Sequence, residues 1–143
     1  MTEKIILLVE DNPDDEQLAV RALKKHNIVN QIVVVRDGQK ALDYLFDESQ
    51  PLPALVLLDW NLPKVSGLEV LQRLRANART AILPVVILTT SKEEQDLLDG
   101  YRSGCNSYIR KPVDFAEFAT AMQQLKVYWL VVNEPPPKNE KSR

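Results

Sequence analysis

The chain has 143 residues, of which 45% are hydrophobic and 27% are charged, and its formal net charge is −2. This composition predicts one globular domain with a sizeable core and excludes an intrinsically disordered chain. The small negative charge offers no electrostatic basis for binding nucleic acid or an anionic membrane. The single cysteine excludes an internal disulfide and fits a cytoplasmic protein, and the first apolar run is too short for a signal peptide or a membrane span.

Short apolar runs that end in polar residues predict β-strands buried on both faces. They cover residues 5–9, 32–35, 55–59 and 84–88, and a further short strand is predicted at 107–110. Helical patterns are predicted between and after them, over about 13–26, after the turn at 36–38, from 66 or 67 past 74, over about 92–103, and from 114 to about 130. Asn12 with Pro13, and Asp114 with Glu117, are typical of helix starts, and Gly104 is typical of a helix end.

The strict alternation of strands and helices predicts an α/β fold, with a five-stranded parallel sheet covered on both faces by five helices. Right-handed crossovers then require the winding to reverse once. A doubly wound, flavodoxin-like sheet of order 2-1-3-4-5 places the first and third strands side by side at that reversal. Order 3-2-1-4-5 is the alternative. The first order is favoured because it brings Asp11 beside Asp59.

Polar residues follow the carboxyl ends of four predicted strands, at the edge where open α/β sheets bind ligands. They are Glu10 and Asp11, then Asp59, Thr89 and Lys111. Three neighbouring carboxylates require a cation or raised pKa values. An all-oxygen set without His or Cys suits Mg²⁺ and argues against Zn²⁺.

This set predicts that Asp59 is a nucleophile that forms an aspartyl-phosphate. Mg²⁺ and Lys111 would spread the charge on the transferring phosphoryl group, and Thr89 would hydrogen-bond one of its oxygens. Each residue taken alone has an ordinary interpretation as part of a turn or a helix cap. The joint pattern at four strand ends favours the chemical interpretation.

These residues resemble the receiver domain of two-component response regulators over about residues 4–126. The matching segments are Val-Glu-Asp at 9–11, Leu-Leu-Asp-Trp-Asn-Leu-Pro at 57–63 with Gly67, Pro-Val-Val-Ile-Leu-Thr at 84–89 and Tyr-Ile-Arg-Lys-Pro at 108–112. The resemblance implies that Asp59 accepts a phosphoryl group from a histidine kinase. It also implies that Asp11 and Asp59 bind Mg²⁺ directly. Glu10 would act through water, and Asn61 would supply a main-chain carbonyl.

The same resemblance assigns roles at the fourth and fifth strands. Thr89 and Tyr108 match a switch pair, in which the threonine moves toward the phosphate and the tyrosine ring turns inward. Lys111 matches the phosphate-binding lysine, with a cis bond to Pro112. Thr90 stands where a small residue controls access to the phosphoryl group.

A closer likeness is to single-domain regulators paired with cyanobacterial and other bacterial phytochromes. It rests on Leu-Thr-Thr-Ser at 88–91 and on Tyr-Trp-Leu-Val-Val at 128–132 before a proline-rich tail. We expect a receiver domain over residues 1–130 with a long fifth helix. Residues 131–143 are expected to form a solvated, disordered tail that is too short for a DNA-binding output domain.

Output is then expected to be a binding event. The apolar residues Tyr128, Trp129 and Val131 predict a homodimer contact on the face made by the fourth helix, the fifth strand and the fifth helix. The alternative is that this segment folds back on its own domain. Trp60 is predicted to point away from Asp59 by strand alternation.

Three other functions were weighed against a phosphorylation switch. A haloacid-dehalogenase-like phosphatase needs a second Asp two residues after the nucleophile, where this chain has Asn61. A P-loop enzyme needs a glycine-rich loop, and the chain has only 4 Gly. A phosphorylation-independent interaction module of the same fold is the remaining alternative, and the full set of site residues disfavours it. We therefore predict a phosphoacceptor with slow autodephosphorylation, and not an enzyme that turns over a substrate.

Overall fold

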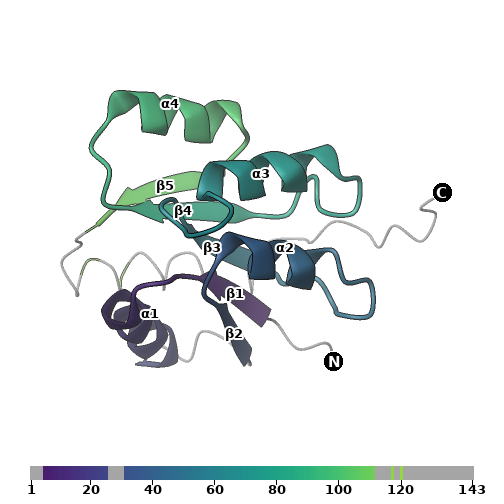
Figure 1. Ribbon diagram of the computed structural model, residues 1–143. Coiled ribbons are helices and arrows are strands. Elements are labelled where there is room, and N and C mark those ends of the chain that lie inside the picture. The colour runs from purple at the N-terminus through teal and green to yellow at the C-terminus, as the bar shows by residue number, and fades with distance from the viewer. Residues whose placement is uncertain (1–4, 26–30, 112–116, 118–119, 121–143) are drawn as a thin grey trace.

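The computed structural model describes residues 5–25, 31–111, 117 and 120 (Figure 1). Its elements are β1 (Ile5–Val9), α1 (Pro13–Lys25), β2 (Gln31–Val35), α2 (Gly38–Leu45), β3 (Leu55–Asp59), α3 (Gly67–Ala76), β4 (Val85–Thr89), α4 (Glu94–Arg102) and β5 (Ser107–Arg110). Several predictions lie outside the described residues. They concern most of the fifth helix with Tyr128, Trp129 and Val131, the bond to Pro112, and the C-terminal tail.

The five strands form one parallel sheet in the order β2-β1-β3-β4-β5. This confirms the predicted doubly wound order, and the alternative 3-2-1-4-5 is wrong. The register aligns the strand ends, because Val9 pairs with Leu58 and Asp59 pairs with Leu88. The residues that follow β1, β3, β4 and β5 therefore meet at one edge of the sheet.

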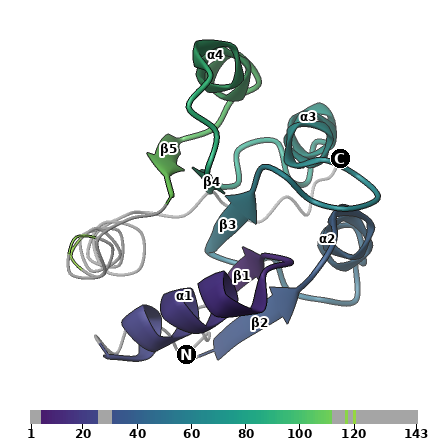
Figure 2. The ribbon, with the colours of Figure 1, turned by 60° about the vertical axis from the view of Figure 1, so that its left-hand side comes forward.

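Helices cover both faces of the sheet, which explains why the central strands β1, β3 and β4 are buried at every position. Ala19, Ala22 and Leu23 of α1 pack against one face, in a cluster that includes Leu8 and Leu57. Helices α2 and α3 pack against the other face, in a second cluster with strand residues of opposite alternation. Figure 2 shows α1 on one side of the sheet and α2, α3 and α4 on the other.

Side-chain caps set the starts of three helices. Asn12 Oδ1 accepts hydrogen bonds from the N–H groups of Asp14 at 2.8 Å and Asp15 at 3.1 Å, as expected for a cap before α1. Ser66 caps α3, which begins at Gly67, one of the two starts predicted from the sequence. Asp37, predicted only as part of a turn, caps α2 by accepting a hydrogen bond from the N–H of Lys40 at 2.7 Å.

Helix α4 begins later than predicted, at Glu94 instead of about Lys92. The reason is local, because Glu93 keeps an extended backbone while its N–H donates to Ser91 Oγ at 3.1 Å. Gly104 follows the helix with a φ of 98°, a left-handed conformation that favours glycine. Within the described ranges, no helix is long and apolar enough to cross a membrane.

Candidate functional site

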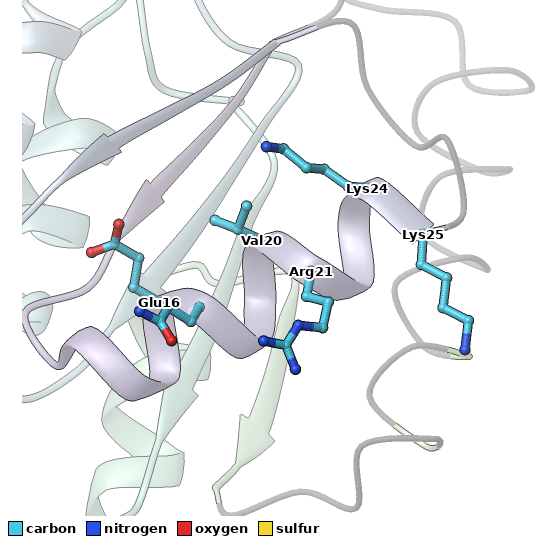
Figure 3. Close-up of a pocket in the computed structure, with 6 residues that line it drawn as sticks. Glu16, Val20, Arg21, Lys24 and Lys25 are labelled. Carbon is cyan, nitrogen blue, oxygen red and sulfur yellow. The ribbon is translucent and has the colours of Figure 1, made fainter.

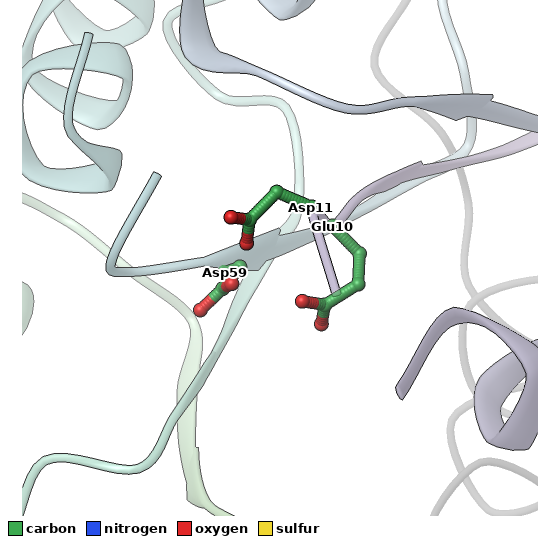
Figure 4. A group of neighbouring side chains, drawn as sticks. All are labelled: Glu10, Asp11 and Asp59. Carbon is green, nitrogen blue, oxygen red and sulfur yellow. The ribbon is translucent and has the colours of Figure 1, made fainter. Parts of the chain in front are cut away.

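Three carboxylates from two neighbouring strand ends form the centre of the site. One oxygen each from Glu10, Asp11 and Asp59 lie within 4.8 Å of one another (Figure 4). Glu10 is 1% exposed and Asp59 is 5% exposed, whereas Asp11 is exposed to solvent. The parallel pairing of β1 with β3 produces this cluster, because both strands end at the same edge of the sheet. The sequence predicted this grouping.

Burial dominates the electrostatics of Asp59. Desolvation, together with the hydrogen bonding and charge of Glu10, raises the pKa of Asp59 to about 8. The charge of Lys111 and the N–H of Asn61, which lies 3.3 Å from Asp59 Oδ1, act in the opposite direction. The donor set fits a hard divalent cation such as Mg²⁺, since it offers oxygens only and two of its carboxylates are buried. Such a cation would offset the repulsion between Glu10 and Asp59.

Lys111 brings the nearest positive charge to the cluster. Its Nζ donates to Glu10 Oε1 at 2.9 Å and to Asp15 Oδ2 at 2.8 Å, and it lies 3.9 Å from Asp59 Oδ1. Its backbone N–H donates to the carbonyl of Thr89, which fixes the start of its side chain at the end of β4. Burial lowers the pKa of Lys111, but its hydrogen bonds to Asp15 and Glu10 and the charge of Asp59 outweigh burial and raise it.

Asp15 is a member of this network that the sequence analysis missed. It lies in the first turn of α1, where an acid is expected simply because of the helix dipole. Its carboxylate is partly buried, with 31% of the side chain exposed, and it reaches Lys111 across the edge of the sheet. The local sequence pattern does not distinguish it from the neighbouring acids Asp14 and Glu16 in the same turn.

Thr89 ends β4 next to Leu88, the register partner of Asp59. Its side chain is completely buried, and its hydroxyl oxygen accepts a hydrogen bond from the N–H of Ser91 at 3.0 Å. A hydroxyl that accepts from the backbone keeps its own proton available for donation. The arrangement therefore leaves Thr89 able to donate to a ligand at the strand ends.

Tyr108 lies on β5, where its ring packs against two other aromatic rings. The centroid of its ring is 6.5 Å from that of Trp60, in a T-shaped arrangement, and 6.5 Å from that of Tyr101. Its hydroxyl is buried and has no hydrogen-bond partner among the described residues. Burial, followed by the nearby charge of Asp96, raises the pKa of Tyr108.

Ser91 lies between these two predicted switch residues. Its N–H donates to Thr89, while its hydroxyl donates to Asp96 Oδ2 at 2.6 Å. Ser91 therefore links the end of β4 to the first turn of α4, a connection that was not predicted from the sequence.

Two glycines hold the loop after Asp59 close to the sheet. A Cβ at Gly67 would lie 2.5 Å from the carbonyl oxygen of Asp59, and a Cβ at Gly38 would lie 1.9 Å from the carbonyl oxygen of Val65. No side chain fits at either position. Trp60 packs in the core cluster with α2 and α3, while Asp59 takes part in the carboxylate cluster.

A second surface feature lies on α1, apart from the carboxylates. An open hollow of about 630 Å³ is lined by Glu16, Gln17, Val20, Arg21, Lys24 and Lys25 (Figure 3). Glu16 is already paired with Arg36 by two hydrogen bonds of 3.1 and 2.9 Å. The residues that line the hollow include no buried acid beside a hydroxyl or a lysine. The hollow therefore offers no chemistry comparable to that at the strand ends.

Comparisons with known proteins agree with this geometry. The protein-family model of the response regulator receiver domain matches residues 6–123. The chain is 42% identical over 135 residues to the probable methanogenesis regulatory protein FilR2 of Methanothrix harundinacea, covering 92% of this chain and 87% of that protein.

Two solved structures are also similar. The Mn²⁺-bound form of response regulator Rcp1 aligns with a TM-score of 0.83 at 36% identity, over 94% of this chain and 99% of that chain. Curated Rcp1 comes from Synechocystis sp. and is 37% identical over 131 residues, covering 89% of each protein. The phosphorylated cyanobacterial phytochrome response regulator RcpA aligns with a TM-score of 0.84 at 34% identity, over 95% of this chain and 100% of that chain.

Proposed function

The chain belongs to the family of response regulator receiver domains, and from this premise we propose that it is a phosphorylation-controlled switch whose phosphoacceptor is Asp59. The observation that carries the proposal is the position of Lys111. Its ammonium lies 3.9 Å from the Asp59 carboxylate, at the edge of the sheet where Glu10 and Asp11 also lie. A nucleophilic carboxylate beside a fixed ammonium and a hard-cation site is the arrangement that phosphoryl transfer needs.

The reaction follows from these residues. A carboxylate oxygen of Asp59 attacks the phosphorus of the donor, a P–O bond to Asp59 forms, and the bond to the leaving group breaks with its electron pair. Lys111 offsets charge on the phosphoryl oxygens, and the Thr89 hydroxyl donates a hydrogen bond to one of them. Since only the ionised carboxylate attacks, the raised pKa of Asp59 opposes the reaction until a cation is present.

Mg²⁺ is the proposed cofactor. Glu10, Asp11 and Asp59 would hold it, with the main-chain carbonyl of Asn61 as a further ligand. Bound Mg²⁺ supplies positive charge that favours the ionised form of Asp59 and offsets charge on the transferring phosphoryl group. The similarity to the Mn²⁺-bound form of Rcp1 supports a divalent cation at this edge.

The proposed donor is a sensor histidine kinase. The similarity to RcpA, described as a phytochrome response regulator, supports a kinase of the phytochrome type. The chain would act in the cytoplasm without binding nucleic acid or a membrane. Residues 1–130 would form the receiver domain, and residues 131–143 a C-terminal tail.

The proposed output is a change in a protein-binding surface. Thr89 would move toward the phosphoryl group, the Tyr108 ring would turn inward, and the contacts of Ser91 would pass the movement of Thr89 to α4. Leu98 and Tyr101 leave an apolar surface on α4, with 46% and 52% of their areas exposed. Together with β5 and the predicted fifth helix, this surface would form a homodimer contact.

Intact-mass spectrometry tests the proposed reaction. The protein is incubated with Mg²⁺ and a small acyl-phosphate donor, and one added phosphoryl group is expected. Asp59→Asn and a sample without Mg²⁺ should remain unlabelled, whereas Asp43→Asn, which removes an exposed acid on α2, should be labelled like the wild type. Absence of label in the wild type would contradict the proposal and favour a phosphorylation-independent module. Continuous release of phosphate from simple esters would favour a hydrolase.

A further inference from the structure

We infer that Asp15 is a positioning residue that restrains the Lys111 ammonium and competes with the phosphoryl group for it. The inference rests on the proposed function and adds a residue to it. Lys111 Nζ lies 2.8 Å from Asp15 Oδ2 but 3.9 Å from Asp59 Oδ1. The ammonium therefore donates a hydrogen bond to Asp15, as it does to Glu10, and none to the proposed phosphoacceptor. Asp15 thereby draws the ammonium toward α1.

Asp15 differs from the carboxylates of the cluster in its position. It is on a helix and not at a strand end, and the carboxylates that could share a cation are Glu10, Asp11 and Asp59. Its backbone N–H is fixed by Asn12 Oδ1 at 3.1 Å, so the first turn of α1 presents its carboxylate to Lys111. Asp15 can therefore be altered without removing a proposed ligand of the cation.

The two hydrogen-bond partners of Lys111 are held unequally. Glu10 is 1% exposed, and its second oxygen accepts a hydrogen bond from the N–H of Asn12 at 3.2 Å. Asp15 keeps 31% of its side chain exposed, so water can solvate its carboxylate if Lys111 leaves. An ion pair with such exposure is screened by water and weak. Lys111 can therefore leave Asp15 at a lower cost than Glu10.

Phosphorylation changes what Lys111 must contact. An ammonium has three N–H donors, and carboxylates engage two of them. Those two carboxylates also more than neutralise its single positive charge, so an anionic donor meets little net attraction. Releasing Asp15 frees one N–H for the phosphoryl oxygens and leaves Glu10 as the one carboxylate bonded to the ammonium, which strengthens the electrostatic stabilisation of those oxygens.

Asp15→Asn tests this inference, because it removes the charge and keeps the size of the side chain. The matched control is Asp14→Asn. Asp14 is the preceding residue, its N–H is capped by the same Asn12, and its exposed carboxylate has no hydrogen bond or ion pair to any residue that the structure describes. Both variants change the net charge equally, and both lie in the first turn of α1.

The rate of phosphorylation by a small acyl phosphate at saturating Mg²⁺ is the first measurement. We expect Asp15→Asn to react about two- to fivefold faster than Asp14→Asn, in keeping with a partly exposed ion pair. Beryllofluoride, a non-covalent mimic of the phosphoryl group, provides a second measurement without turnover. Trp60 fluorescence should report its tighter binding to Asp15→Asn by a similar factor.

A double-mutant cycle separates positioning of Lys111 from a general effect of charge. In a Lys111→Ala background, adding Asp15→Asn should change the residual rate no more than adding Asp14→Asn does. The inference is overturned if Asp15→Asn matches Asp14→Asn, if it slows the reaction, or if its effect survives without Lys111. If the wild type acquires no phosphoryl group at all, the proposed function fails and the inference fails with it.

Discussion

Replacing Asp59 with Asn should stabilise the fold, because the wild type keeps an acid where water cannot solvate it. Burial and the neighbouring Glu10 raise the pKa of Asp59 from 3.8 to about 8. Between these two values the folded protein retains a proton that the unfolded chain has released. The stability of the wild type should therefore fall as the pH rises from about 4 to about 8, and the loss is complete above about 8. Asn does not ionise and escapes this loss.

The size of the effect follows from the same pKa values. A rise from 3.8 to about 8 spans about four pH units, and each corresponds to about 1.4 kcal/mol, which sets a ceiling of about 6 kcal/mol. Movement of Lys111 toward the ionised carboxylate and entry of water would lower the folded pKa, and with it this ceiling. We expect Asp59→Asn to raise the free energy of unfolding by about 2 kcal/mol at about pH 8, and by less than about 1 kcal/mol at about pH 5.

Urea denaturation in the presence of a chelator measures both values. Asp43→Asn serves as the control, since this exposed acid should leave the free energy of unfolding nearly unchanged at both pH values. Added Mg²⁺ should reduce the difference in free energy of unfolding between Asp59→Asn and the wild type, because it stabilises the wild type more. An equal difference in free energy of unfolding at both pH values would refute the reasoning. So would an Asp59→Asn variant that is less stable than the wild type.

Two other predictions test packing and assembly. Gly38→Ala should lower the free energy of unfolding by about 2–4 kcal/mol in urea denaturation, because its Cβ would lie 1.9 Å from the Val65 carbonyl oxygen. Gly100→Ala should cost less, since its Cβ would meet side chains and not backbone, Ile87 at 3.1 Å and Tyr108 at 3.2 Å. Equal costs for the two substitutions would contradict this view of the Gly38 contact. Light scattering should show that the wild type is a dimer and that Trp129→Glu is a monomer. A wild type that is monomeric at high concentration, phosphorylated or not, would refute the proposed dimer contact.

The fold was largely predictable from local sequence patterns. The strands predicted at residues 5–9 and 107–110 match β1 and β5 at both ends. The strand order was harder, because periodicity cannot separate 2-1-3-4-5 from 3-2-1-4-5. The chemistry of the strand ends decided it, since only the first order brings Asp11 beside Asp59.

The contacts that sequence patterns could not supply join side chains far apart in the chain. Asp15 and Lys111 are separated by 96 positions, and the first turn of α1 gives Asp15 an ordinary helix-start role. Ser91 was predicted only as part of a loop, yet its N–H reaches Thr89 and its hydroxyl reaches Asp96. Such contacts depend on the path of the loops after each strand, which the hydrophobic pattern does not determine.

Arg75 makes further contacts of this kind, at the opposite end of the strands from the carboxylates. Its guanidinium donates to the carbonyls of Leu83 at 2.8 Å and Gly104 at 2.7 and 2.9 Å. In the sequence it is one more cation near the end of a helix. In the structure it joins the loops before β4 and β5, which helps to keep these strands in the register that aligns their carboxyl ends.

Chemical trapping of the phosphorylated residue tests the central claim most directly. After reaction with the acyl phosphate and Mg²⁺, borohydride reduces an aspartyl-phosphate to homoserine, and peptide mass spectrometry locates the change. The proposed function predicts homoserine at position 59 alone, formed only when both the donor and Mg²⁺ are present. Homoserine at position 11 or at another acid, with position 59 unchanged, would contradict the assignment of Asp59 as the phosphoacceptor.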